Sequence, residues 1–468
     1  ELTAEGAITA GKPCIVEADG DVAQVAETAV SQAAGTPVVF ESAGVIYTSI
    51  AYDANAQKVV IAYQDGGNSN YGTAIVGTVS SDSISFGTPT VFESSETIYT
   101  SVAYDANAQK VVIAYRDGNN SEYGTGIVGT VSGTSISFGS STAFETGGST
   151  NYMSAVYDSS AQKVVIAYLV SSTGKAVVGT ISGTSISFGS VATFNSGNTT
   201  YVAASYDENA SKVVIAYRDN GNSNYGTAVV GTVSGTSISF GSEVVFNSAS
   251  TLHVAISYDS DVQKHVVAYQ DQGNSNYGTG IIGTVSDTSI SFGSEVAFNS
   301  GASNNIGIVY DSNAQKSVIA YKDNANSSYG TFVSGVVSGT SISFSTATVF
   351  ESATSGYMEA AFDANAQKVV VPYQDGGNSN YGTAVVLQAG YTSTNLTSEN
   401  FIGFAENDCT DNGLATIQLG GSVNDKQTSL TAGQTYFVQT DGTIGTTADS
   451  PSVTAGTAVS ATEILVKG

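Results

Sequence analysis

The chain has 468 residues, of which 14 are Lys or Arg and 40 are Asp or Glu, so its formal net charge is −26. This length allows one large all-β domain and a smaller module. The acidic balance argues against nucleic-acid partners, which bind through clustered Lys and Arg. No apolar run reaches the ~18–20 residues that a membrane span requires.

The first 42 residues precede the repeated part of the chain. Residues 1–30 predict short strands joined by turns. Residues 31–42 match the end of a repeat, because Gly35-Thr36-Pro37 and Phe40-Glu41-Ser42 recur within 87–94. They predict a final strand with no unit in front of it. We expect this strand to complete the last unit and close a ring, which removes two exposed sheet edges.

Seven copies of one unit follow. Each contains a Tyr-Asp pair, replaced by Phe-Asp in the last copy, and the pairs are 49 to 53 residues apart. A period of this size with four short strands per unit is typical of a β-propeller. We therefore predict an all-β fold with a seven-bladed propeller of four-stranded blades over residues 31–390. The pairs begin at Tyr52, Tyr104, Tyr157, Tyr206, Tyr258, Tyr310 and Phe362.

The second copy illustrates the four predicted strands, at 98–105, 110–117, 125–132 and 135–139. The first is rich in small residues, which suits a crowded centre. The second is apolar on both faces and should be covered on both sides by neighbouring blades. The fourth alternates strictly, as an outer strand with one solvated face should.

One lysine per copy lies five residues after the Asp of the Tyr-Asp pair, across a hairpin. We interpret it as a turn-closing ion pair worth about 0–1 kcal/mol rather than as part of a binding site. The lysines are Lys58, Lys110, Lys163, Lys212, Lys264, Lys316 and Lys368.

A polar loop of the pattern Asp-x-x-Asn-Ser-x-Tyr joins the second and third strands in six copies, whereas the third copy has residues 169–174 instead. We expect these loops on one face of the disc, beside the connections between blades. One interpretation is an Asx-type turn with the Tyr packed on the next blade. The other is a ring of shallow sites for glycans or Ca²⁺. No loop has the acidic density of a dedicated calcium site, so we expect no cofactor. The candidate ligand-binding residues are Asp65, Asn68, Tyr71, Asp117, Asn120, Tyr123, Asp219, Asn222, Tyr225, Asp271, Asn274, Tyr277, Asp323, Asn326, Tyr329, Asp375, Asn378 and Tyr381.

Catalytic constellations are not evident. His253 and His265 occupy positions that the second copy fills with Tyr99 and Val111, and no third metal ligand accompanies them. The repeat has no Ser/His/Asp arrangement. Near-identical units also argue against a single asymmetric active site. We therefore expect no enzymatic activity.

Residues 391–468 again predict short strands with Gly and Asp-Gly turns. A closed propeller brings its ends together, so we expect 1–30 and 391–468 to form one small β-module. The two cysteines, Cys14 and Cys409, lie in these flanks. Free buried thiols and one disulfide between the flanks are both compatible with their spacing, and neither forms a metal motif.

The most distinctive segments of the flanks are residues 6–13, 19–22, 400–405 and 430–444, the last reading LTAGQTYFVQTDGTI. They resemble segments of structural proteins of tailed bacteriophages, especially marine ones. The repeat is similar to repeats in fibre-like and adhesin-like proteins of marine viruses and bacteria. The resemblance implies a virion structural protein of the fibre, spike or decoration type, and it carries over no catalytic residues.

Taken together, these features predict a non-enzymatic protein of the virion surface that displays a propeller to a host-surface glycan or protein. The flanking module would attach it to other virion proteins and build a homo-oligomer, with no nucleic-acid partner and no membrane insertion. The alternative is a secreted bacterial lectin or adhesin that binds through a face of the same propeller.

Overall fold

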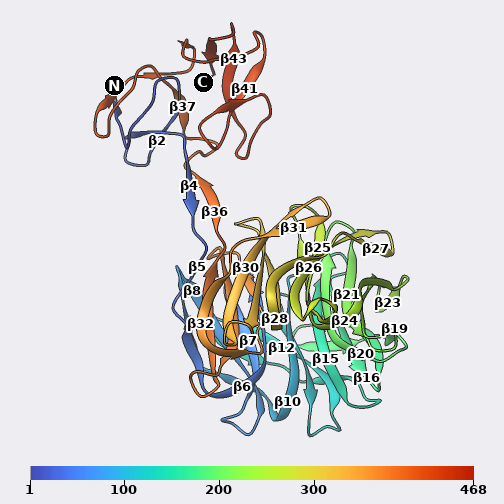
Figure 1. Ribbon diagram of the computed structural model, residues 1–468. Coiled ribbons are helices and arrows are strands. Elements are labelled where there is room, and N and C mark those ends of the chain that lie inside the picture. The colour runs from blue at the N-terminus through green and yellow to red at the C-terminus, as the bar shows by residue number, and fades with distance from the viewer. Residues whose placement is uncertain (1, 468) are drawn as a thin grey trace. The chain divides into compact units, whose positions relative to one another are not determined.

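The computed structural model describes residues 2–467 and divides into two compact units (Figure 1). The larger unit is Gln32–Ala389. The smaller unit combines the chain up to Ser31 with the chain from Gly390 onward. Within the described residues the helical content is one turn, η1 (Gln272–Asn274), and no helix could cross a membrane.

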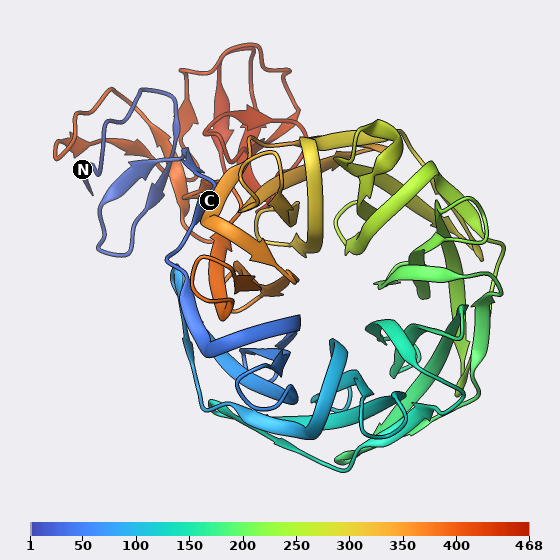
Figure 2. The same ribbon diagram turned by 60° about the horizontal axis from the view of Figure 1, so that its bottom comes forward.

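One antiparallel pairing pattern recurs in every copy of the repeat in the larger unit, and the copies are arranged around a common centre (Figure 2). The second copy shows the pattern. The latter half of β10 (Thr90–Asp105) is the inner strand and pairs with β11 (Lys110–Asp117), which pairs with β12 (Tyr123–Ser132). The outer strand is split into β13 (Ser135–Phe138) and β14 (Thr142–Glu145), which both pair with β12.

The other copies repeat these elements. Inner strands are β6 (Val38–Asp53), β15 (Thr150–Asp158), β20 (Thr199–Asp207), β24 (Val244–Asp259), β28 (Val296–Asp311) and β33 (Ala361–Asp363), with β32 (Thr348–Gly356) before β33. Second strands are β7 (Lys58–Asp65), β16 (Lys163–Val170), β21 (Lys212–Asp219), β25 (Lys264–Asp271), β29 (Lys316–Asp323) and β34 (Lys368–Asp375). Third strands are β8 (Tyr71–Ser80), β17 (Thr173–Ser182), β22 (Tyr225–Ser234), β26 (Tyr277–Ser286), β30 (Tyr329–Ser338) and β35 (Tyr381–Gln388). Outer strands are β5 (Ala33–Ala34), β9 (Ser83–Phe86), β18 (Ser185–Phe188), β19 (Ala192–Asn195), β23 (Ser237–Phe240), β27 (Ser289–Phe292) and β31 (Ser341–Phe344).

The second strands form the core of each sheet. In β11 the residues from Val111 to Tyr115 are fully buried, because both faces pack against neighbouring sheets. The buried Tyr115 hydroxyl donates to Glu93 Oε2 at 2.9 Å, which satisfies its polar end. The predicted two-sided burial of this strand is confirmed.

The ring is closed by the start of the chain. β5 pairs with the end of β35, with Ala34 opposite Leu387, and the first half of β6 continues along the same strand, with Val38 opposite Ala384. Strands from opposite ends of the unit thus complete one sheet, as the orphan strand predicted. The fold-class prediction of an all-β propeller is confirmed.

The predicted ion pair across the first hairpin is wrong for the copies at Asp53 and Asp105. Lys58 lies opposite Asp53 in register, yet its Nζ donates to the Gln57 carbonyl at 3.2 Å. Lys110 contacts the equivalent carbonyl of Gln109. The Asp53 carboxylate instead accepts backbone N–H groups of its own turn, because those donors are nearer than a flexible ammonium group.

The smaller unit contains a four-stranded and a five-stranded sheet, both antiparallel, and pairs the two flanks with each other. Pairing of β2 with β37 and of β4 with β36 joins segments nearly 400 residues apart in the sequence. Its strands are β1 (Leu2–Thr3), β2 (Pro13–Val16), β3 (Val22–Gln24), β4 (Glu27–Val30), β36 (Tyr391–Thr394), β37 (Phe401–Ala405), β38 (Leu414–Ala415), β39 (Ile417–Gln418), β40 (Val423–Asn424), β41 (Thr435–Val438), β42 (Ile444–Gly445), β43 (Val453–Ala458) and β44 (Ile464–Val466).

Both cysteines are free thiols in this unit. Cys14 and Cys409 belong to one apolar cluster, and each Sγ donates to a nearby backbone carbonyl rather than joining the other. Burial raises the pKa of the Cys14 thiol to about 12. The structure therefore contains the free-thiol alternative and not the disulfide.

Candidate functional site

The polar loops and the connections between sheets lie at the same end of the sheets, as expected. The Gly118 N–H donates to the carbonyl of Glu96 at 2.8 Å, which joins a loop to the chain entering its own sheet. The Thr97 N–H donates to the carbonyl of Asn70 at 3.0 Å, which joins the same connection to the preceding loop. We call this end of the ring the loop face and the opposite end, with the Tyr-Asp turns, the hairpin face.

The loop aspartates are structural. Each is only 5–9 % exposed, and the Asp219 Oδ1 accepts the N–H of Gly221 at 2.9 Å, in the manner of an Asx turn. Others also accept a side-chain donor, as Asp117 does from Ser95 Oγ at 2.7 Å. These carboxylates are occupied within their loops. The six are Asp65, Asp117, Asp219, Asp271, Asp323 and Asp375.

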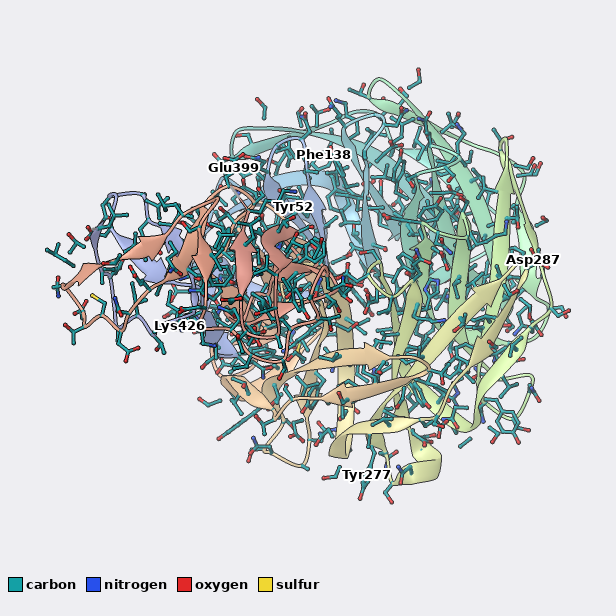
Figure 3. All side chains as sticks on the ribbon, turned by 90° about the horizontal axis from the view of Figure 1, so that it is seen from above. Tyr52, Phe138, Tyr277, Asp287, Glu399 and Lys426 are labelled. Carbon is teal, nitrogen blue, oxygen red and sulfur yellow. The ribbon has the colours of Figure 1, made fainter. Side chains whose placement is uncertain are left out.

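The asparagines and tyrosines of the loops remain accessible. Every loop Asn side chain is exposed, and every loop Tyr is half-buried. The two lie in one turn, since the Tyr225 N–H donates to the carbonyl of Asn222 at 3.0 Å. Tyr277 lies away from the centre of the ring, as Asp287 does in the turn after β26 (Figure 3). Each loop thus offers an amide beside an aromatic ring, and glycan binding there remains a prediction. The asparagines are Asn68, Asn120, Asn222, Asn274, Asn326 and Asn378, and the tyrosines are Tyr71, Tyr123, Tyr225, Tyr277, Tyr329 and Tyr381.

The third copy interrupts this ring of loops. A two-residue turn, Ser171 and Ser172, replaces the loop between β16 and β17. Beside it Lys175 Nζ lies 3.1 Å from Glu145 Oε2. Burial alone would raise the pKa of Glu145, but the N–H of Gly147 and the Lys175 ammonium outweigh it and hold that pKa below its ordinary value. Lys175 lies in the third strand at the position that Thr125 has in the second copy.

A second ring of residues on the inner strands escaped the sequence analysis. In β6 the register passes from Ile46 opposite Gln64 to Ser49 opposite Ala62, so that Tyr47 and Thr48 together face one residue of β7. This β-bulge puts Tyr47 at φ 52°, which is unusual for a bulky residue. Bulges of this kind re-aim a side chain. The equivalent positions, all at φ 49–54°, are Tyr47, Tyr99, Tyr152, Tyr201, His253, Asn305 and Tyr357.

Six of these seven side chains form a continuous arc of aromatic rings. We call all seven residues, including Asn305, the collar. Neighbouring ring centroids are 4.8 Å apart for Tyr47 and Tyr99 and at most 5.4 Å apart elsewhere in the arc. The arc runs from Tyr357 through Tyr47 to His253. Asn305 interrupts it. Each collar side chain is half-buried.

The collar surrounds the mouth of a central channel. One cavity of about 190 Å³ is lined by a collar residue from each of the seven copies, and a second of about 180 Å³ shares residues with it, including Met153 and Glu359. Glu359 has no counterpart, because the other copies have Ser, Ala or Gly two residues after the collar position. Its Oε2 accepts from Ser49 Oγ at 3.1 Å. The side chain is open to the channel, but the protein around that channel removes bulk water and raises the pKa of Glu359 to about 7.

The two histidines have separate surroundings. His265 is fully buried with its Nε2 3.4 Å from Asp207 Oδ2, and burial lowers its pKa although Asp207 opposes this. His253 stands in the collar, where burial and Lys322 lower its pKa to about 4. Among residues 2–467 no group of three or more His, Cys, Asp or Glu side chains could hold a metal ion.

The signal for the collar is present in the sequence. Every collar residue lies five positions before the first residue of its Tyr-Asp pair, and six of the seven are Tyr or His. From the sequence alone, only the correspondence of His253 to Tyr99 was recognised. The bulge could not be read from strand alternation, because one extra residue moves the side chain to a direction that alternation does not predict.

Comparison with known proteins shows the fold. No protein-family model matches the chain, and no curated protein matches it by sequence. Among solved structures, it is similar to the BP39L lectin from Burkholderia pseudomallei, with a TM-score of 0.55 and 8 % identity over 76 % of this chain and 98 % of the lectin. A protein of unknown function from Dyadobacter fermentans has a TM-score of 0.47 and 11 % identity, over 78 % of this chain and 99 % of that one. The NanB sialidase from Streptococcus pneumoniae has a TM-score of 0.44 and 12 % identity, over 75 % of this chain and 69 % of the sialidase. The lectin similarity places this chain among β-propeller proteins.

Proposed function

We propose that this chain is a non-enzymatic attachment protein that binds carbohydrate through the loop face of its propeller. The observation that carries the proposal is the sixfold recurrence of an exposed Asn beside a half-exposed Tyr on that face. Sugars are bound by amide hydrogen bonds to hydroxyls together with packing of a sugar ring on an aromatic side chain. Several weak, equivalent sites on one surface give avidity to a ligand that is itself repeated.

The ends of the larger unit support display of this face. β5 pairs with Leu387 and Gln388 at the end of β35, and β35 begins at the loop face with Tyr381. Both ends of the unit therefore lie at the hairpin face. Neither end of the larger unit lies at the loop face.

A catalytic role has less support. Glycoside hydrolysis ordinarily uses two carboxylates on either side of the scissile bond. The loop aspartates are buried and accept hydrogen bonds within their turns, and the two central cavities include one carboxylate, that of Glu359. We therefore propose binding without turnover.

The setting that we propose is the surface of a virion, as a tail fibre, spike or decoration protein mounted through the smaller unit. The resemblance of the flanks to phage structural proteins supports this setting. Immunogold electron microscopy of particles from the source tests it. Gold on particles is expected, whereas antigen found only in a particle-free secreted fraction favours the bacterial lectin.

Carbohydrate binding can be tested on a glycan array with two matched variants. One replaces the loop residues Asn68, Asn120, Asn222 and Asn378 with Ala. The other replaces Asn55, Asn107, Asn209 and Asn365, which are exposed amides of the hairpin face. We expect the loop variant alone to lose binding. The proposal fails if the wild-type protein retains no glycan or if the two variants bind equally.

A further inference from the structure

The mouth of the central channel differs in chemistry from the loops around it. Its lining consists of the collar, of Thr48 and Thr100, of apolar residues such as Val202, and of one carboxylate, that of Glu359. No Lys or Arg side chain lines this cavity or the one beneath it. A ligand here meets aromatic surface and negative charge.

The collar has dimensions that suit a cation on its axis. Seven positions at the observed centroid spacing of 4.8–5.4 Å stand about 6 Å from the axis, which is the outer range of a cation–π interaction. A group on the axis would therefore lie near several aromatic rings at once. Quaternary ammonium groups are recognised in proteins by aromatic residues gathered around them.

Glu359 supplies the counter-charge. It is the one residue with a carboxyl group among those that line both cavities, and Ser49 Oγ donates a hydrogen bond to its Oε2 at 3.1 Å. That bond occupies Oε2. A carboxylate in a channel with little bulk water gains more from an organic cation than one at an open surface does.

Basic side chains lie around the collar but outside the cavity lining, so Glu359 is the charged group that a ligand in the cavity can contact directly. His253 is neutral near pH 7 because its pKa is lowered to about 4. The Arg116 guanidinium lies 5.6 Å from the Tyr99 centroid and is held there by a bond to Asn151 Oδ1 at 2.6 Å, but its positive charge remains. Arg218 and Lys322 lie near Tyr152 and His253 but outside the cavity lining. The net charge of −26 attracts cations at long range.

We propose that the channel mouth is a binding site for an organic ammonium group, held by the collar and by the Glu359 carboxylate. This site is distinct from the loop sites of the proposed function, and the outcome of the glycan-binding test does not affect it. Its ligand would be a small cation or the ammonium group of a larger molecule whose remainder lies on the loop face.

Titration calorimetry with choline tests the site, because 3,3-dimethylbutan-1-ol is its neutral carbon isostere. We expect the wild-type protein to bind choline at least tenfold more tightly than the isostere. Glu359→Gln should weaken choline binding tenfold or more and leave the isostere unchanged. Glu122→Gln removes the same charge from an exposed loop and serves as the control. Equal binding of choline and its isostere, or an unchanged affinity in Glu359→Gln, overturns the proposal, as does the absence of saturable choline binding.

Two collar variants test the aromatic part. Tyr47→Asn copies the residue that the sixth copy already has at Asn305, so the backbone can accept it, and should weaken choline binding threefold to tenfold. Asn305→Tyr completes the arc of aromatic rings and should strengthen choline binding. Ethanolamine in place of choline shows whether a quaternary or a primary ammonium group is preferred. Unchanged choline affinity in both variants contradicts the role of the collar, and near-ultraviolet circular dichroism checks that both are folded.

Discussion

The loop face carries two rings of residues that differ in regularity. The outer ring consists of the Asp-x-x-Asn-Ser-x-Tyr loops, which are nearly identical in six copies, and its aspartates are bound within their own turns. The collar is less regular, since His253 and Asn305 replace tyrosines and Glu359 lies beside it without a counterpart. The recurring aspartates are used by the fold of every such loop, whereas Glu359 does not recur and meets no structural requirement that the other copies share.

The largest effect on stability is expected from weakening the closing strand of the propeller, because both the loops and the collar depend on closure. The ring centroid of Phe40, on the closing strand, lies 5.1 Å from that of Tyr63. The ring centroid of Phe92, on the outer strand of a sheet that the closing strand does not complete, lies 5.2 Å from that of Tyr115 in the next sheet. Replacing either by Ala should cost about 3–5 kcal/mol. We expect Phe40→Ala to lower the unfolding temperature more, because it also weakens closure. Equal effects in differential scanning calorimetry would mean that closure adds nothing to local packing.

Within one loop, substitution of Asp219 should affect stability, whereas substitution of Asn222 should affect glycan binding. Asp219→Ala removes the acceptor of two backbone N–H groups, those of Gly221 and Asn222, and should reduce the free energy of unfolding by about 1–2 kcal/mol. Asn222→Ala should change it by less than about 0.5 kcal/mol, since that side chain is exposed. Urea denaturation measures both. A larger loss in Asn222→Ala would reverse the roles assigned to the two residues.

The collar region should show a pH-dependent stability. The raised pKa of Glu359, about 7, means that the folded state binds a proton more readily than the unfolded chain. The contribution of Glu359 to the free energy of unfolding is therefore greatest below pH 5 and decreases as the pH rises towards 7. Glu359→Gln should raise the melting temperature by roughly 1 °C at pH 8 and leave it nearly unchanged at pH 5. A rise at pH 5 instead would contradict the sign of this linkage.

The smallest effect is expected on the hairpin face. Lys110 Nζ donates to the Gln109 carbonyl at 3.5 Å, a long bond to its own neighbour, so Lys110→Ala should change the free energy of unfolding by less than about 0.5 kcal/mol. Lys175→Ala is the contrasting variant, because its partner Glu145 is 8 % exposed and would lose a charged neighbour. Chemical denaturation of the two should rank Lys175→Ala as the more destabilised.

The period of the Tyr-Asp pairs, the apolar second strand and the orphan strand at 31–42 were sufficient to predict the propeller and its closure. They sufficed because strand burial and repeat length are local properties of the sequence that recur in each copy. The loop residues were also found, with both of their interpretations. Which of the two roles each residue has depended on burial, which separates the enclosed Asp219 from the exposed Asn222.

The sequence by itself determined the repeat, the strand order within it and the pairing of its two ends. Only the tertiary structure decided which residues meet at the centre. Tyr47 and Tyr357 are 310 positions apart, yet their ring centroids are 5.3 Å apart, because closure brings the first and last copies together. A bulge in each inner strand then turns one side chain per copy into the shared channel, and convergence of seven copies on one axis makes a site that no single copy contains.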